Sequence, residues 1–242
     1  MVYLRMQRHR ELILYGEAQM NKATTLRPGQ KPPAAVVTPV VFVVDDDISV
    51  REALELLIAH GGWRPQLLAS AQEFLAHPRP QCPSCLLLDL GLPDLNGLEL
   101  QERIGAGRPE MPIIFITGRG DIPTTVRAMK AGAIEFLTKP LEPEVLLEAI
   151  ERALARSRTS LEEQIRLQAL RARHDSLSPR EREVMALVVR GQLNKQVGAE
   201  LGISEITVKA HRGRVMRKMR ANSLPDLVDM ASLLGLHAPG RD

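Results

Sequence analysis

The feature that most limits the fold is a series of short, almost wholly apolar runs separated by amphipathic windows. Apolar character on both faces of a short run is typical of strands in a parallel sheet that helices cover on both sides. Windows with helical spacing, such as the one holding Val50, Leu54 and Ile58, lie between the runs. The runs are VVFVV (40–44), PQLLA (65–69), CLLLDL (85–90), PIIFITG (112–118) and AIEFLTKP (133–140). The alternation predicts an α/β domain with a doubly wound, five-stranded parallel sheet of the flavodoxin-like type.

Beyond residue 157 the strand pattern stops and every signal is helical. Residues 158–175 place Leu161, Ile165 and Ala169 at helical spacing among charged side chains, and Ser160 with Glu163 resembles a helix start, so we predict a solvated linker helix. A coiled-coil seam is the alternative, but the segment is shorter than that pattern needs. Ser178, Pro179 and Glu181 then mark the start of a small all-α domain with four helices. The predicted organisation is an N-terminal extension (1–39), the α/β domain (40–156), the linker helix (157–176) and the helical domain (177–242).

The two predicted domains differ in the sign of their net charge. Residues 40–156 hold 11 Lys+Arg against 17 Asp+Glu, whereas residues 176–242 hold 11 against 7. This asymmetry predicts cation chemistry in the first domain and a polyanion partner for the second. No apolar stretch is long enough for a membrane span and the first twenty residues do not fit a secretory signal, so we expect a cytoplasmic protein.

The two cysteines, Cys82 and Cys85, form a lone CxxC motif. A tetrahedral zinc site needs two further ligands, and no second CxxC or closely spaced His pair supplies them. Two unpaired thiols are the favoured interpretation, and a redox switch stays open as the alternative.

Polar side chains gather where the predicted strands end. Ligands of doubly wound sheets bind outside the carboxyl ends of the strands, so we expect these side chains to share one rim of the sheet. They are Asp45, Asp46 and Asp47 after the first strand, Asp89 after the third, Thr117 after the fourth and Lys139 after the fifth.

The chemistry of this rim predicts a magnesium-dependent phosphoryl site. Clustered carboxylates ionise poorly without a cation, and oxygen ligands select Mg²⁺. Thr117 and Lys139 are groups that bind phosphoryl oxygens, and Asp89 is a plausible nucleophile for an aspartyl phosphate. The alternative is structural: the acids cap a helix and Lys139 neutralises them.

Four motifs in order give the first domain a resemblance to the receiver domains of two-component response regulators. They are the acids after VVFVV, then LLLDLGLPDLNG, FITG and FLTKP. The C-terminal segment holds LSPREREVMALVVRG and then NKQVGAELGISEITVKAHRGRVMRKM. Through these motifs the segment from Leu177 to about Leu236 resembles the LuxR-type helix-turn-helix, and this domain order is that of the FixJ/NarL subfamily.

The resemblance implies a role for each matching position. Asp89 is the phosphoacceptor, and Asp45, Asp46, Asp89 and the backbone carbonyl of Gly91 are the Mg²⁺ ligands. Thr117 and Lys139 contact the phosphoryl group, Phe136 is the aromatic switch residue, and the bond from Lys139 to Pro140 is cis. Asp47 is expected to be a solvated neighbour or a helix cap.

The helix EITVKAHRGRVMRKM (205–219) follows a tight turn, and it is expected to enter the major groove of DNA as the second helix of a helix-turn-helix. Lys209, Ala210 and Gly213 are predicted to face the bases, and Thr207, Arg212, Arg217 and Lys218 to contact phosphates. His211 is left as either a core-edge or a phosphate-contacting residue. The last helix, from Leu224 to Leu234, is expected to close the small core, to form a dimer face, or both.

The expected function is therefore that of a response regulator. A sensor histidine kinase phosphorylates Asp89, and the protein then forms a homodimer. The homodimer binds double-stranded promoter DNA and acts on RNA polymerase there. The protein is expected not to be an enzyme, apart from its own Mg²⁺-dependent phosphotransfer and slow dephosphorylation. A Mg²⁺-dependent phosphohydrolase is one alternative, and a DNA-binding protein with a vestigial receiver is the other.

Overall fold

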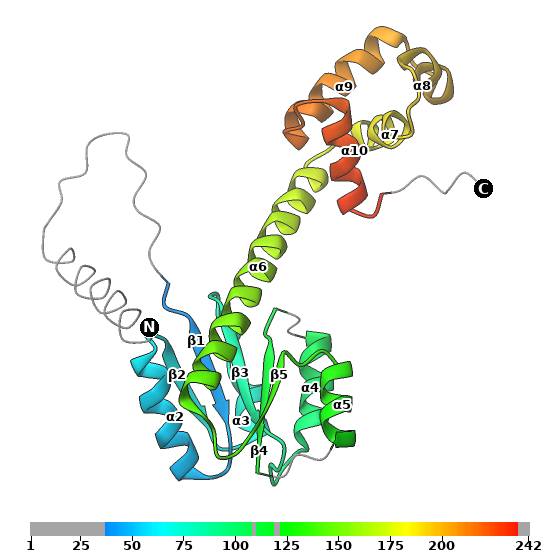
Figure 1. Ribbon diagram of the computed structural model, residues 1–242. Coiled ribbons are helices and arrows are strands. Elements are labelled where there is room, and N and C mark those ends of the chain that lie inside the picture. The colour runs from blue at the N-terminus through cyan, green and yellow to red at the C-terminus, as the bar shows by residue number, and fades with distance from the viewer. Residues whose placement is uncertain (1–36, 108–109, 119–121, 237–242) are drawn as a thin grey trace, which may run out of the picture. The chain divides into compact units, whose positions relative to one another are not determined.

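The α/β domain is built on one sheet in which all five strands run parallel, in the order β2-β1-β3-β4-β5 (Figure 1). The computed structural model describes residues 37–107, 110–118 and 122–236. The strands are β1 (Val40–Val44), β2 (Arg64–Leu68), β3 (Ser84–Asp89), β4 (Ile113–Thr117) and β5 (Glu135–Thr138). The helices between them are α2 (Ile48–His60), α3 (Ala71–Ala76), α4 (Gly97–Gly107) and α5 (Ile122–Lys130). This strand order is that of the flavodoxin-like fold, so the predicted fold class is confirmed.

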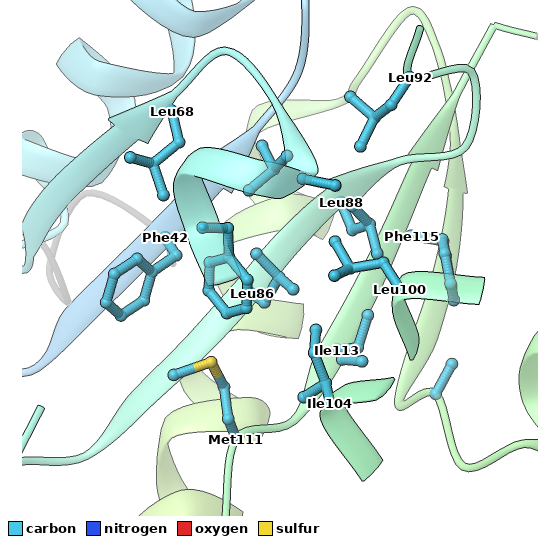
Figure 2. Close-up of a cluster of buried hydrophobic side chains, with 14 of the residues drawn as sticks. Phe42, Leu68, Leu86, Leu88, Leu92, Leu100, Ile104, Met111, Ile113 and Phe115 are labelled. Carbon is cyan, nitrogen blue, oxygen red and sulfur yellow. The ribbon is translucent and has the colours of Figure 1, made fainter. Parts of the chain in front are cut away.

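Two hydrophobic cores cover the two faces of the sheet, because successive side chains of a strand point to opposite faces. One core, shown in Figure 2, joins Phe42 and Leu88 of the sheet to side chains of α3, α4 and α5. The other joins Val41 and Leu87 to α2 and to α6 (Pro143–Asp175). Every residue of β1, β3 and β4 is buried, which explains why these three strands read as unbroken apolar runs.

The cysteines belong to different cores. Cys82 packs in the core under α3 to α5 and Cys85 in the core under α2 and α6, and both thiols are free. Burial raises the pKa of both thiols above the ordinary value. These observations favour unpaired, unreactive thiols over a redox switch.

Helix α6 is longer than the sequence pattern indicated. The linker helix was predicted to be separate, with its start at Ser160, but one helix runs from Pro143 to Asp175. The Ser157 side chain is buried and accepts a hydrogen bond of 3.0 Å from the backbone N–H of Ser84. Gln164 also reaches Glu110 of the α/β domain, at 3.3 Å. The helix is therefore tied to the first domain across the position where a break was predicted.

Four short helices build the C-terminal domain: α7 (Pro179–Val188), α8 (Asn194–Leu201), α9 (Glu205–Met219) and α10 (Leu224–Leu233). Ser178 and Glu181 form the predicted capping box at the start of α7. Val184, Val208, Val215 and Leu227 are central members of the core, to which Leu170 near the end of α6 contributes. None of the helices in the described part of the chain combines the length and the apolar character that a membrane crossing requires. The N-terminal extension predicted for residues 1–39 lies outside the described residues except for its last three positions.

Candidate phosphoryl site and nucleic-acid interface

The register of the sheet brings Asp45 and Asp89 together. Val44 of β1 pairs with Leu88 of β3, so the residues that follow them lie side by side at the carboxyl edge. Thr117 ends β4 opposite Thr138 of β5, which places Lys139 at the same edge. The backbone N–H of Lys139 donates to the carbonyl of Thr117 at 2.8 Å, and the peptide bond from Lys139 to Pro140 is cis as predicted.

One ammonium group bridges the two acids at this edge. Lys139 Nζ lies 2.7 Å from Oδ2 of Asp45 and 2.9 Å from Oδ1 of Asp89. The second oxygen of Asp89 accepts a hydrogen bond of 2.6 Å from the backbone N–H of Gly91. A side chain at position 91 would begin 3.1 Å from the same oxygen, so glycine leaves this side of the carboxylate open.

Burial makes this ion pair unusual. The Asp45 residue is 0% exposed, and Asp89 and Thr117 are also buried. Burial raises the pKa of Asp45 above its ordinary value, although the hydrogen bond from Lys139 opposes the shift. Desolvation also acts to lower the pKa of Lys139, but its hydrogen bonds to Asp45 and Asp89 outweigh that effect and the net shift is upward. The charged form of Lys139 is therefore held by two carboxylates.

The three consecutive acids play different parts. Asp45 is buried against Lys139, whereas Asp46 and Asp47 are exposed. Asp47 caps α2, because its carboxylate accepts a hydrogen bond of 2.8 Å from the N–H of Ser49. One of the two roles predicted for Asp47, the helix cap, is thus confirmed.

The donor set suits a hard cation in its chemistry. Among the residues that the structure describes, no group of three or more His, Cys, Asp and Glu side chains is arranged to hold a metal ion, and Asp45 and Asp89 both pair with Lys139. These two carboxylates nevertheless converge, and the adjacent Asp46 is exposed, so every side-chain donor at this point is an oxygen. Such a set fits Mg²⁺ rather than a softer metal. The Mg²⁺ ligands Asp45, Asp46, Asp89 and Gly91 stay a prediction.

Two residues that sequence reasoning did not single out shape the loops around the site. Arg51 donates from Nη1 to the backbone carbonyl of Asp45 at 2.6 Å. Asp94 accepts hydrogen bonds from the backbone N–H groups of Ala71 and Gln72, at 3.3 and 2.9 Å, and so ties the loop after β3 to the start of α3. The contacts of Asp94 have no local sequence signal, since both of its partners lie more than twenty positions away.

Phe136 is partly buried rather than solvated. Its ring lies 6.2 Å from that of Phe115 between centroids, at an interplanar angle of 39°, and it packs against the core under α3 to α5. Thr117 and Phe136 therefore lie on neighbouring strands, with Phe136 opposite Phe115 and two residues before the end of β5.

In the C-terminal domain, α8 and α9 are joined by a tight turn. Helix α8 ends at Gly202, whose φ of 66° is in the left-handed region, and Ser204 caps α9. A Cβ atom at Gly198 of α8 would lie 2.7 Å from the carbonyl oxygen of Ile203. The turn can therefore pack this closely against α8 only because position 198 is glycine. This pair of helices is the predicted helix-turn-helix.

Each predicted DNA contact has a definite place on α9. Lys209, Ala210, Gly213, Arg217 and Lys218 are exposed, and Thr207 and Arg212 are half-buried. A Cβ atom at Gly213 would meet nothing within 4 Å, so packing inside the domain does not require glycine there.

Several of these side chains already have partners within the domain. Lys209 pairs with Glu205 at 3.1 Å, and Arg212 donates to Asn194 at 3.2 Å. Lys218 is the most strongly held, since its Nζ lies 2.7 Å from the buried carboxylate of Glu181 and 3.0 Å from the carbonyl of Ser176. We infer that Lys218 stabilises the domain whether or not it also contacts a phosphate.

The surroundings of His211 help to choose between its two predicted roles, at the edge of the core or in contact with a phosphate. The residue is half-buried, and its Nδ1 atom is enclosed without a hydrogen-bond partner in the described structure. This placement favours the core-edge role. Helix α10 closes the core through Leu227 and Ala231, as expected.

Residues 41–151 match the response regulator receiver domain family, and residues 175–231 match the luxR family of bacterial regulatory proteins. Nodulation protein W of Bradyrhizobium diazoefficiens is 50% identical over 199 residues, which cover 82% of this chain and 88% of that protein. The chain belongs to the FixJ/NarL response regulators.

Further relatives agree with this assignment to the response regulators. The transcriptional regulatory protein FixJ of Rhizobium meliloti is 42% identical over 191 residues, covering 79% of this chain and 94% of that protein. The solved structure of the response regulator StyR superposes with a TM-score of 0.68 at 48% identity, over 81% of this chain and 99% of that one. The predicted family, and with it the pairing of a receiver with a LuxR-type domain, is confirmed.

Proposed function

We propose that this response regulator controls transcription through phosphorylation of Asp89 by a sensor histidine kinase. The observation that carries the proposal is the placement of the Asp89 carboxylate, which ends β3 and is hydrogen bonded to Lys139 Nζ and to the N–H of Gly91. Phosphorylation then favours a homodimer that binds promoter DNA and acts on RNA polymerase. A cytoplasmic location follows from the need to reach both the kinase and the DNA.

The residues at this edge suit an in-line phosphoryl transfer. An oxygen of Asp89 attacks the phosphorus of a phosphohistidine, the P–N bond breaks as the O–P bond forms, and the histidine nitrogen leaves with its electron pair. Lys139 Nζ, already 2.9 Å from Oδ1, is placed to neutralise the phosphoryl oxygens. Asp45 holds that ammonium from the other side, so the lysine is oriented before the phosphodonor arrives. Thr117 at the end of β4 completes the rim as a hydroxyl donor.

The residues that would hold magnesium are Asp45, Asp46, Asp89 and the carbonyl of Gly91. When bound, Mg²⁺ supplies positive charge that screens the phosphoryl oxygens from the carboxylates. Transfer of the phosphoryl group from Asp89 to water at the same site accounts for a slow dephosphorylation.

The surface formed by α5 and β5 is suited to transmit the structural change that follows phosphorylation to a second copy of this chain. Ile122, Val126 and Met129 follow one another on α5 at helical spacing, and all three are exposed. Val145 on α6 is exposed as well, and Phe136 lies on β5 beside Thr138. Movement of Thr117 and Phe136 toward the phosphoryl group would reshape this apolar face and shift the population toward the dimer.

One titration tests the proposal directly. DNA binding and the dimer fraction of the wild-type protein are measured with and without acetyl phosphate and Mg²⁺, at one fixed salt concentration. We expect both quantities to rise on phosphorylation. If the protein is phosphorylated but its DNA affinity and dimer fraction do not change, the switch mechanism is wrong.

The kinase has a suitable docking surface beside Lys139. An apolar groove of about 720 Å³ lies between α2 and the segment that follows β5, and Leu56, Leu57, Lys139 and Leu141 are among its lining residues. Leu56 is 75% exposed there, so it adds little to the receiver core. A helix of the kinase seated in this groove would bring its phosphohistidine close to the end of β5.

We therefore expect Leu56→Asp to slow phosphotransfer from a histidine kinase by about tenfold, since burying a leucine is worth about 1.5–3 kcal/mol. Phosphorylation by acetyl phosphate, which needs no docking, should be unchanged. The matched control is Ile122→Asp on α5, which is also strongly exposed but belongs to the proposed dimer face. Equal slowing by both variants, or slowing with both phosphodonors, would argue against docking at the groove.

A further inference from the structure

Ile206 is an apolar side chain that the C-terminal domain does not bury. It is the second residue of α9 and is 80% exposed, whereas Val208, Val215 and Met219 of the same helix are buried in the core. Its two neighbours are already engaged, because Glu205 pairs with Lys209 and the hydroxyl of Thr207 lies 2.8 Å from that of Ser204. Ile206 thus stands free at the N-terminal end of the helix without serving its cap or its core.

Ile206 begins a ridge of three uncharged residues. Residues three or four positions apart lie on the same side of a helix, which aligns Ile206 with Ala210 and Gly213. All three are exposed. The side chains shrink from isoleucine to alanine to glycine along the ridge, so Ile206 is the member that reaches furthest from the helix axis.

The charges beside the ridge select the kind of partner. Exposed cations at Lys209, Arg214, Arg217 and Arg220 surround it, and Glu205 is the acid on this helix. A second copy of α9 would bring a like charge, whereas DNA brings phosphates to the flanks. Helix α9 also lies inside the region that matches the luxR family.

Inside the major groove, an apolar side chain has one matching group among the base edges. Thymine presents a C5-methyl group there, and the other three bases present polar donors and acceptors. A buried contact between the isoleucine and that methyl removes apolar surface of both partners from water.

We propose that Ile206 is a specificity-determining residue that contacts a thymine methyl group in each DNA half-site. The inference rests on the proposed DNA-binding function and adds to it the identity of one base. The cations on the flanks then position the helix against the phosphates, while Ile206 distinguishes thymine from the remaining bases.

The test removes the methyl group from the DNA rather than from the protein. Sites are selected from random double-stranded DNA with the full-length phosphorylated protein, and each thymine is replaced in turn by deoxyuridine. At one thymine position per half-site we expect the replacement to weaken wild-type binding about fourfold, the effect of one buried methyl-sized group. Ile206→Ala should bind the thymine and deoxyuridine sites equally, at constant salt.

A matched control comes from the start of α8. Leu193 is 69% exposed in the same domain, and Leu193→Ala should keep the preference for thymine over deoxyuridine. A preference that survives in Ile206→Ala, or sites at which no thymine can be told from deoxyuridine, would overturn this inference and leave the DNA-binding proposal intact. Failure to select any sequence would instead overturn the DNA-binding proposal itself. Thermal unfolding of Ile206→Ala should match the wild type, since the side chain is exposed.

Discussion

Replacing Asp89 by asparagine is expected to abolish phosphorylation and, with it, every response to a phosphodonor. The amide has no anionic oxygen to attack phosphorus, so the aspartyl phosphate cannot form. Incubation of Asp89→Asn with acetyl phosphate and Mg²⁺ should give no phosphoprotein, and its DNA affinity and dimer fraction should stay at the level of the untreated wild type. Intact-mass measurement for the phosphoryl group and analytical ultracentrifugation for the dimer check the two parts separately.

The control for this variant is Asp47→Asn. It makes the same chemical change at the same rim, and asparagine caps a helix about as well as aspartate, so α2 should be preserved. We expect Asp47→Asn to be phosphorylated like the wild type. A phosphoryl group found on Asp89→Asn would mean that another residue is the acceptor, and loss of phosphorylation in both variants would indicate a general effect of charge at the rim.

Much of this site could be predicted from the sequence because parallel strands repeat one geometry. Buried strands are apolar along their length, so the polar residue that ends each run marks the carboxyl edge of the sheet. The register of β1 with β3 then brings Asp45 beside Asp89 without any further information. Asp47 shows the limit of that reasoning, since a carboxylate next to a site can equally serve as a helix cap.

Features that depend on distant partners were not predictable. Ser160 and Glu163 carry a helix-start signal, yet α6 continues through them because Ser157 and Gln164 are held by the receiver. Lys218 has the character of a phosphate-binding cation, but its nearest carboxylate is Glu181, 37 positions away in the chain. The exposure of Ile206 likewise depends on how α9 packs, because its apolar side chain could equally have belonged to the core.

The buried pair of Asp45 and Lys139 leads to the second prediction with a large effect. Lys139→Met removes the cation and leaves the carboxylate of Asp45 enclosed without a charged partner. We expect the free energy of unfolding to fall by about 3 kcal/mol, the lower end for breaking a buried ion pair, since the lysine is partly exposed. Urea unfolding in a chelator, followed by the fluorescence of Trp63, which packs against the receiver core, measures the change without interference from metal ions.

The pH dependence of this loss has a defined sign. The pKa of Asp45 is already raised by burial, and removal of Lys139 raises it further. An acid with a raised pKa in the folded state favours folding when it is protonated, so its contribution is present below its ordinary pKa and is lost as the pH rises through the folded value. The destabilisation of Lys139→Met should therefore be largest near neutral pH and shrink in acid.

A second substitution separates the ion pair from general disruption of the site. In Lys139→Met combined with Asp45→Asn the fully enclosed carboxylate is neutral. The charge left without a cation is then Asp89, which is 7% exposed and keeps its hydrogen bond from the N–H of Gly91, so stability should return to within about 1 kcal/mol of the wild type. Asp89 remains in the double variant, but without Lys139 its phosphorylation by acetyl phosphate should stay slow. Recovery of stability without recovery of phosphorylation would show that Lys139 has two separable roles. If the double variant is as unstable as Lys139→Met alone, then the lysine stabilises the receiver by packing and not by compensating Asp45.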